Sequence, residues 1–106
     1  MLEIEQSIVF EKWFLKLTIN IQSKLNDYID RVSQGNTSNC KNIRNGISEI
    51  VINYQKGYRI YYTILKNNTI LLLLAGGDKS GHGKSQQHDV EKAIAIKNYM
   101  KEQGDL

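Results

Sequence analysis

The sequence predicts an α+β fold, in which helices and strands occupy separate parts of the chain. Apolar residues recur at helical spacing over residues 10–32, at a spacing of two over residues 47–74, and at helical spacing again after residue 89. The predicted order is therefore two helices, a set of strands and a final helix. Because short turns join the strands, we expect them to pair antiparallel.

Two amphipathic helices, joined by a tight break at residues 18–20, are predicted to open the chain. Their apolar stripes consist of Phe10, Trp13, Phe14 and Leu17, then Ile21, Leu25, Tyr28, Ile29 and Val32. Because Trp13 and Phe14 lie on the periodic stripe, we expect them in the core. Residues 33–46 are rich in Ser, Asn and Gly, which predicts a long connection with a short extended piece around residues 41–43.

Three antiparallel strands are predicted over residues 47–54, 57–65 and 69–75. Alternation divides the middle strand into two faces: Tyr58, Ile60, Tyr62 and Ile64 on one, and Arg59, Tyr61, Thr63 and Leu65 on the other. We expect the more apolar first set to pack on the helices, which leaves Arg59 and Tyr61 on the open side. The unbroken apolar run at residues 70–74 predicts a central strand covered on both faces.

The last helix is predicted from a single apolar stripe, Val90, Ala93, Ile94 and Met100, with Asp89 as its N-cap. A chain of 106 residues is long enough for one domain with one modest core. We therefore expect residues 1–106 to form a single domain.

The composition excludes several classes of protein. No stretch reaches the roughly 18 apolar residues of a membrane span, and the start lacks a basic segment followed by an apolar one, so we expect a cytoplasmic protein without a signal peptide or membrane partner. One cysteine, Cys40, cannot form an internal disulfide. With His82 and His88 as the histidines, a closed zinc site is not expected, and no cofactor or metal is predicted.

Positive charge is concentrated in the middle of the chain, although the net charge is only +3. Residues 1–39 carry four basic and five acidic side chains, residues 40–84 carry seven and two, and residues 85–106 carry three and four. The middle third therefore has a charge of +5 and each flank −1. Such a basic region favours a polyanionic partner, nucleic acid first; the alternative is a lysine-rich surface that only solvates the protein.

The run "GGDKSGHGKS", residues 76–85, raises the question of a phosphate-binding P-loop. A P-loop has Gly, four residues and then Gly-Lys-Ser, because backbone N–H groups at fixed positions must all point at the phosphates. Counting back from Gly83, the first glycine should stand at position 78, where the chain has Asp78. The antiparallel sheet is also the wrong context, so a nucleotide site is not predicted.

An ordered set of motifs resembles the RelE/ParE toxin superfamily, in particular its HigB-like branch of phage-associated addiction module killer proteins. The motifs are "FEKWFLKL" (10–17), Gly-Asn (35–36), Lys41, "GISEI" (46–50), "GYRIYY" (57–62), "ILLLLAGGDKS" (70–80) and "QQHDVEKA" (86–93). The resemblance spans about nine-tenths of the chain. It implies an N-terminal helical hairpin packed on a twisted antiparallel sheet of three to four strands, with a C-terminal helix.

The resemblance also implies a function. RelE-like members cut mRNA in the ribosomal A site without a metal, and each is silenced by a co-expressed antitoxin. The implied partners are thus a helix-turn-helix antitoxin, the ribosome and mRNA, with operator DNA reached only through the antitoxin complex. A ParE-like inhibitor of DNA gyrase, and an impaired toxin that retains only antitoxin binding, are the alternatives.

Candidate site residues follow from the same match. Arg59 corresponds to the family's strand arginine at the scissile phosphate and Lys79 to the basic residue after the next strand; the alternatives are an Arg59 ion pair with Glu49 and a solvated Lys79. His82 and His88 are further candidates for proton transfer, because histidine titrates near neutral pH. The expected RNA contacts are Lys41, Arg44, Lys56, Tyr61 and Lys84.

Two departures from the family pattern bear on this site. Relatives carry Glu-Leu-Arg where this chain has Glu-Ile-Val at residues 49–51, so Val51 replaces a basic group beside Arg59. About four residues near 81–84 are also inserted. This insertion either brings His82 and Lys84 to the site or reflects drift in a decayed toxin.

Overall fold

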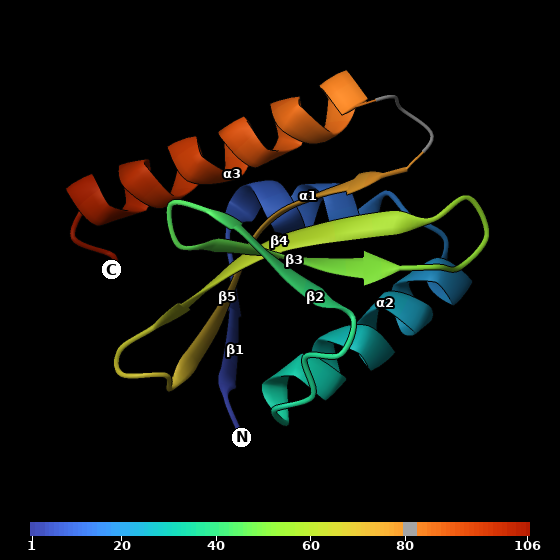
Figure 1. Ribbon diagram of the computed structural model, residues 1–106, viewed down its shortest axis with the longest axis horizontal. Coiled ribbons are helices and arrows are strands. Elements are labelled where there is room, and N and C mark those ends of the chain that lie inside the picture. Colours follow the sequence, from blue (N-terminus) through green and yellow to red (C-terminus); the bar gives the residue numbers. More distant parts are fainter. Residues whose placement is uncertain (80–82) are drawn as a thin grey trace.

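Five strands and three helices occur in residues 1–79 and 83–106, the part of the chain that the computed structural model describes. Helices α1 (Ile8–Leu15) and α2 (Ile19–Ser33) cover one face of a single sheet, and α3 (Gly83–Glu102) crosses the other (Figure 1). The predicted α+β class, the N-terminal pair of helices and the C-terminal helix are confirmed.

The sheet has the strand order β1-β5-β4-β3-β2. Its strands are β1 (Glu3–Gln6), β2 (Cys40–Arg44), β3 (Ile47–Ile52), β4 (Tyr58–Leu65) and β5 (Ile70–Asp78). The antiparallel meander of β3, β4 and β5 is confirmed, as is the extended piece that became β2. β1 was not predicted. It pairs parallel with β5, so the described sheet is mixed and has five strands rather than three to four antiparallel ones.

The core between the sheet and the first two helices is built from the apolar stripes predicted above. Both helices begin at a hydroxyl cap: Ser7 Oγ accepts the N–H of Phe10 at 3.0 Å, and Thr18 Oγ1 accepts the N–H of Ile21 at 3.4 Å. The members that are buried in this core are Phe10, Ile21, Leu25, Ile29, Val32, Ile50, Ile52, Tyr58, Ile60, Tyr62, Leu71 and Leu73. The helix-facing side of β4 is therefore the predicted one.

A second core lies on the opposite face of the sheet, beneath α3. Its buried members are Ile47, Tyr61, Leu72, Leu74, Ala75, Val90 and Ala93. The expectation that Tyr61 points to an open side is therefore wrong, because α3 covers this part of the face and leaves Tyr61 0% exposed. The prediction that β5 is buried on both faces is confirmed, since Leu71 and Leu73 belong to the core under the first two helices, and Leu72 and Leu74 to the core under α3.

A β-bulge interrupts the pairing of β4 with β5. Tyr61 pairs with Ala75, but the next residue, Tyr62, pairs with Leu73, which leaves Leu74 as the additional residue of β5. Leu74 and Ala75 consequently both belong to the core under α3. The bulge is tied to the start of α1, because Ser7 Oγ donates a 2.6 Å hydrogen bond to the Leu74 carbonyl and Ser7 N–H donates to the Leu73 carbonyl at 2.9 Å.

Helix α3 begins earlier than predicted. It starts at Gly83, so Asp89 lies inside the helix and is not its N-cap, which corrects the expectation from the apolar stripe. That stripe begins only at Val90 because the first turns of α3 overlie the polar end of the sheet rather than the core. No helix in the described residues is both long and apolar enough to span a membrane.

Candidate functional site

The candidate site lies where β4 begins and β5 ends, on the side of the sheet that faces α3. Arg59 pairs with Gly77 across the two strands, and the backbone N–H of Lys79 donates to the Gly57 carbonyl at 3.0 Å. Side chains two residues apart on a strand share a face, so Arg59, Gly77 and Lys79 are neighbours on one surface. The structure thus brings together Arg59 and Lys79, the two main candidates of the sequence analysis.

The bulge decides which face Lys79 occupies. Before the bulge, Leu71 and Leu73 point toward the helical hairpin, and unbroken alternation would send every later odd-numbered residue the same way. After it, Gly76 lies against the ring of Trp13 on the hairpin side and Gly77 lies under Asp89 of α3. Odd-numbered residues have therefore changed face, and Lys79 joins Arg59.

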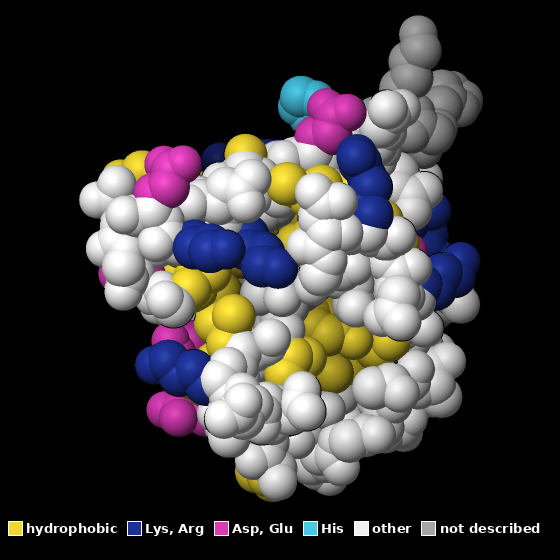
Figure 2. All heavy atoms as spheres, turned by 60° about the vertical axis from the view of Figure 1, so that its left-hand side comes forward, with side chains coloured by type: hydrophobic (Ala, Val, Ile, Leu, Met, Phe, Trp, Pro, Cys, Tyr) yellow, Lys and Arg dark blue, Asp and Glu magenta, His cyan; other side chains and the backbone are white. Residues whose placement is uncertain are grey.

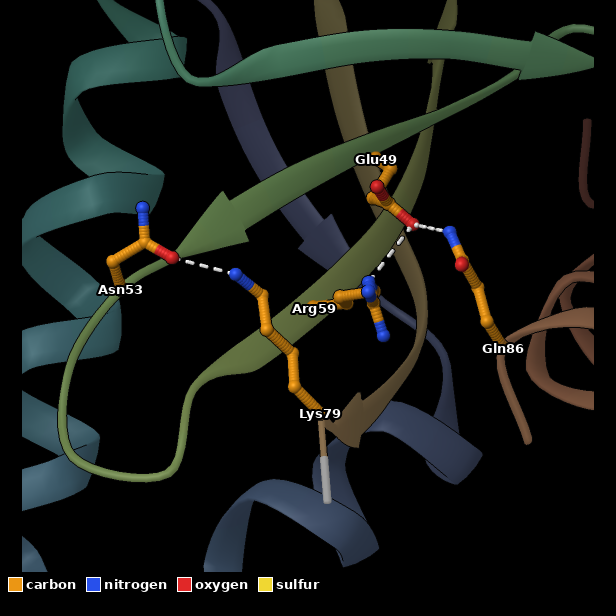
Figure 3. A network of polar contacts seen from close by, with 5 residues as sticks. All are labelled: Glu49, Asn53, Arg59, Lys79 and Gln86. Carbon is orange, nitrogen blue, oxygen red and sulfur yellow. Dashed lines mark hydrogen bonds and ion pairs between the residues drawn. The ribbon is translucent and has the colours of Figure 1, made fainter. Parts of the chain in front are cut away.

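Arg59 is held by a buried carboxylate. Its Nε lies 3.6 Å from Oε2 of Glu49, which is 1% exposed, and the same oxygen accepts a 2.8 Å hydrogen bond from Nε2 of Gln86 on α3 (Figure 3). The ion pair that the sequence left as an alternative is present. It occupies Nε, and the Arg59 side chain as a whole remains 23% exposed.

Lys79 is oriented by the loop between β3 and β4. Its Nζ donates a 2.6 Å hydrogen bond to Oδ1 of Asn53 (Figure 3). Its aliphatic chain crosses Gly57, where an added Cβ would lie 2.7 Å from Lys79 Cδ. Gly57 has φ +86°, a conformation that favours glycine. Lys79 is thus oriented by its neighbours, while its hydrogen bond to Asn53 lies at the surface.

Asp89 is a third charged group at this position and was not predicted as a site residue. Its carboxylate lies over Gly77, so closely that a Cβ there would overlap Oδ2. Burial raises the pKa of Asp89 above its ordinary value, and the neighbouring carboxylate of Asp78 adds to the rise. Three basic groups oppose it: Lys92, His88 and Arg59.

Two buried polar atoms in the described residues have no hydrogen-bond partner: Oε1 of Glu49 and the hydroxyl of Tyr61. Their residues are directly opposite each other on β3 and β4. Burial, followed by the negative charges of Glu49 and Asp89, raises the pKa of Tyr61 above its ordinary value. The Tyr61 hydroxyl therefore stays protonated beside the carboxylate, and its burial removes it from the surface on which an RNA contact was expected.

The other predicted residues are dispersed around this site. Lys41 is exposed on the edge strand β2, where it is the cross-strand partner of Glu49, so it lies on the same face of the sheet as the site. Arg44 is exposed at the end of β2. Lys56 is exposed in the β3–β4 loop, with its Nζ 3.2 Å from Asp78 Oδ2. His88 is exposed on α3. His82, and the side chain of Lys84, lie outside the described residues.

On the face shown in Figure 2, Lys and Arg side chains lie over the middle and right, and basic side chains also lie at the left margin beside acidic ones. Most Asp and Glu side chains on this face lie at the left and upper margins. A separate, mainly apolar hollow lies between the start of α1 and the end of α3, lined by Ile8, Val9, Ala95, Ile96, Tyr99 and Met100 among others. Of the candidate catalytic side chains that the structure describes, none lines that hollow.

Chemically, the arrangement suits a phosphodiester. The guanidinium of Arg59 offers its terminal nitrogens as a planar fork for two phosphate oxygens, and Lys79 adds a second positive charge from the neighbouring strand. In the described residues, no group of three or more His, Cys, Asp and Glu side chains is placed to hold a metal ion.

Comparison with known proteins identifies the family. Residues 12–98 match the model of the phage derived protein Gp49-like family (DUF891), which covers most of the chain. The chain belongs to the Gp49-like family. An uncharacterised protein of Haemophilus influenzae is 33% identical to this Gp49-like chain over 93 residues, covering 87% of the chain and 89% of the relative.

Solved structures show that the Gp49-like chain has the RelE fold. A mutant of the E. coli toxin RelE in the free state aligns with TM-score 0.66 and 14% identity, over 86% of this chain and 96% of that one. A chain of the intact E. coli RelBE toxin-antitoxin complex aligns with TM-score 0.62 and 16% identity, over 76% and 100%. The corresponding match to the RelBE2 complex of Mycobacterium tuberculosis has TM-score 0.60, 16% identity and coverage of 74% and 98%. The fold that the RelE/ParE resemblance implied is thereby confirmed, whereas the HigB-like branch stays a prediction.

Proposed function

We propose that this Gp49-like chain is the toxin of a type II toxin-antitoxin pair and that it acts as a ribosome-dependent mRNA endoribonuclease. The observation that carries the proposal is the shared face of Arg59 and Lys79, which the bulge in β5 creates. The fold match to RelE, and to chains of two toxin-antitoxin complexes, supports both the activity and a cognate antitoxin as partner.

The proposed reaction is attack of an RNA 2′-OH on the adjacent phosphorus: the P–O2′ bond forms while the P–O5′ bond breaks, the 2′-OH proton passes to water, and the 5′ oxygen takes up a proton as it leaves. Negative charge accumulates on the phosphorane oxygens, and Arg59 would bind two of them through its terminal nitrogens. Lys79, held by Asn53, stabilises the same charge or donates a proton to the leaving oxygen. Lys41 and Arg44 on β2 would contact ribosomal RNA, which predicts a strong dependence of binding on salt.

A second candidate function, inhibition of DNA gyrase without RNA cleavage, is favoured by one observation. Val51 is the direct cross-strand partner of Arg59, at the position where relatives carry a basic group. Binding to a protein target tolerates that loss more easily than a catalytic clamp does. An in vitro supercoiling assay with the purified chain distinguishes the two functions.

Induced expression in a bacterial host, followed by primer extension on cellular mRNA, tests the proposal. We expect growth arrest and new cleavage sites within open reading frames from the parent chain, and neither from Arg59→Ala. Arg31→Ala is the matched control, because Arg31 lies on α2 with its guanidinium over the Tyr28 ring, on the other face of the sheet. Growth arrest with intact transcripts would refute the nuclease proposal.

A further inference from the structure

Glu49 is a charged residue that the proposed reaction does not use, although it lies at the centre of the site. It stands in the interior strand β3, between β2 and β4, and is 1% exposed. Moving a carboxylate out of water costs several kcal/mol unless close partners compensate it. A leucine or valine at this position would avoid that cost, so the carboxylate calls for a specific explanation.

The contacts of Glu49 converge on one oxygen. Oε2 accepts the hydrogen bond from Gln86 at 2.8 Å and lies 3.6 Å from Arg59 Nε, whereas Oε1 has no partner in the described residues. The carboxylate thus joins β4 to α3 through a single atom (Figure 3). An aspartate, one methylene shorter, would not reach both partners without movement of the strand.

The way in which Arg59 is held matters for phosphate binding. Glu49 engages Nε, and a guanidinium fixed at Nε still offers both terminal nitrogens in one plane. A bidentate pair with the carboxylate would instead occupy the fork that a phosphate needs. Holding Arg59 in advance of binding also reduces the side-chain entropy lost when the substrate arrives.

Glu49 itself cannot act on the substrate. Its side chain is 1% exposed, enclosed by Tyr61, Arg59 and Gln86, so a ribose hydroxyl would not reach it without displacing one of them. A general base has to come within hydrogen-bond distance of the proton that it removes. The role of Glu49 is therefore exerted through Arg59.

We propose that Glu49 is a positioning residue, which fixes the Arg59 guanidinium through Nε so that its terminal nitrogens are presented to a phosphate, and that Gln86 of α3 holds the Glu49 carboxylate in place. The functional part of this inference rests on the proposed nuclease activity. The positioning part does not, because the order of the Arg59 side chain is measurable in the free protein.

Glu49→Gln tests the inference in two measurements. In single-turnover cleavage on programmed ribosomes, we expect the rate at saturating toxin to fall about tenfold, while the toxin concentration giving half of that rate changes less than twofold. In the free protein, we expect the ¹⁵N heteronuclear NOE of Arg59 Nε to fall from the backbone range toward the values of mobile side chains. Glu102→Gln, an exposed residue at the end of α3, removes the same charge and should change neither.

Gln86→Ala provides a second variant, because Gln86 is only half-buried and its loss should not prevent folding. It should lower the Arg59 Nε order and the cleavage rate in the same direction as Glu49→Gln, but by a smaller factor, about two- to fivefold. A slower reaction with an unchanged Arg59 Nε signal would overturn the positioning role, as would loss of Nε order without any loss of rate. If the parent chain does not cleave mRNA, the nuclease proposal fails, and the NOE measurement still decides whether Glu49 orders Arg59.

Discussion

The aliphatic chain of Lys79 lies directly across the backbone of Gly57, so that a Cβ at position 57 would force the Lys79 side chain to move. This contact joins two of the motifs on which the family resemblance rests, "GYR" and "GGDK", because Gly57 belongs to the first and Lys79 to the second. The glycine before Tyr-Arg makes room for the lysine after Gly-Gly-Asp. The substitution Gly57→Ala should therefore harm both stability and activity.

Gly57→Ala introduces strain at φ +86° and a clash with Lys79. We expect a loss of about 2 kcal/mol in the free energy of unfolding, measured by urea denaturation, together with reduced toxicity. Gly35→Ala is the control, because Gly35 has φ +95° with nothing near its missing Cβ. It should show the backbone strain alone, about 1 kcal/mol, with toxicity retained. Equal costs at the two positions would contradict the proposed contact.

Ser7→Ala removes the hydroxyl that both caps α1 and binds the bulge. The N–H of Phe10 loses its acceptor and the Leu74 carbonyl loses its donor, at a buried position. We expect the free energy of unfolding to fall by about 2 kcal/mol. Thr18→Ala, at the exposed cap of α2, should cost less than about 1 kcal/mol. Similar costs for the two caps would mean that the bond to Leu74 contributes little.

Gly76→Ala would place a methyl group inside the space occupied by the Trp13 ring. Because a packed interior yields little, we expect a cost of about 1–3 kcal/mol in urea unfolding. Trp13→Leu removes the ring atoms in question, so the cost of Gly76→Ala should shrink in that background. A double-mutant cycle measures this coupling, and additivity of the two changes would rule out the contact.

Asp89→Asn should stabilise the protein at neutral pH. A carboxyl whose pKa is raised in the folded state lowers stability at pH values above that pKa, and the penalty disappears as the pH falls through it toward the ordinary value of 3.8. Thermal unfolding at pH 7 should therefore occur at a higher temperature for Asp89→Asn than for the parent, with the difference lost below pH 3.8. The exposed Asp27→Asn serves as control and should change the midpoint little at either pH. A gain that persists at low pH would point to packing instead of charge.

The helices and the antiparallel meander could be predicted from the sequence because their hydrophobic periods are clear. The Gly-Tyr-Arg and Gly-Gly-Asp-Lys motifs pointed to Arg59 and Lys79 as candidate site residues. β1 escaped prediction because Glu3–Gln6 is only four residues long and contains a single apolar residue, Ile4, which is itself exposed, so the segment shows no apolar face of the length that marks a strand. The start of α3 escaped because its first turns, including Asp89, lie over polar groups.

The face of the sheet that each side chain occupies was harder to predict than the helices and strands themselves. The apolar run of β5 carries no alternation from which a bulge could be inferred, so neither the change of face after Leu74 nor the cover that α3 gives to Tyr61 was visible in the sequence. Glu49 was predicted only as an ion-pair partner. Its burial, and its bond to Gln86, depend on the docking of α3, which no local pattern encodes.

The additional residue in β5 can be lost without reversing the charge of the site. If Leu74 were deleted and the turn were kept, Ala75 would follow Leu73 directly and still pair with Tyr61, and alternation would leave Lys79 facing α3 beside Arg59. The end of β5, with Gly77 opposite Arg59, would keep its register. Deletion of Leu74 is thus expected to cost stability, through the lost packing under α3, rather than to change the surface offered to a phosphate.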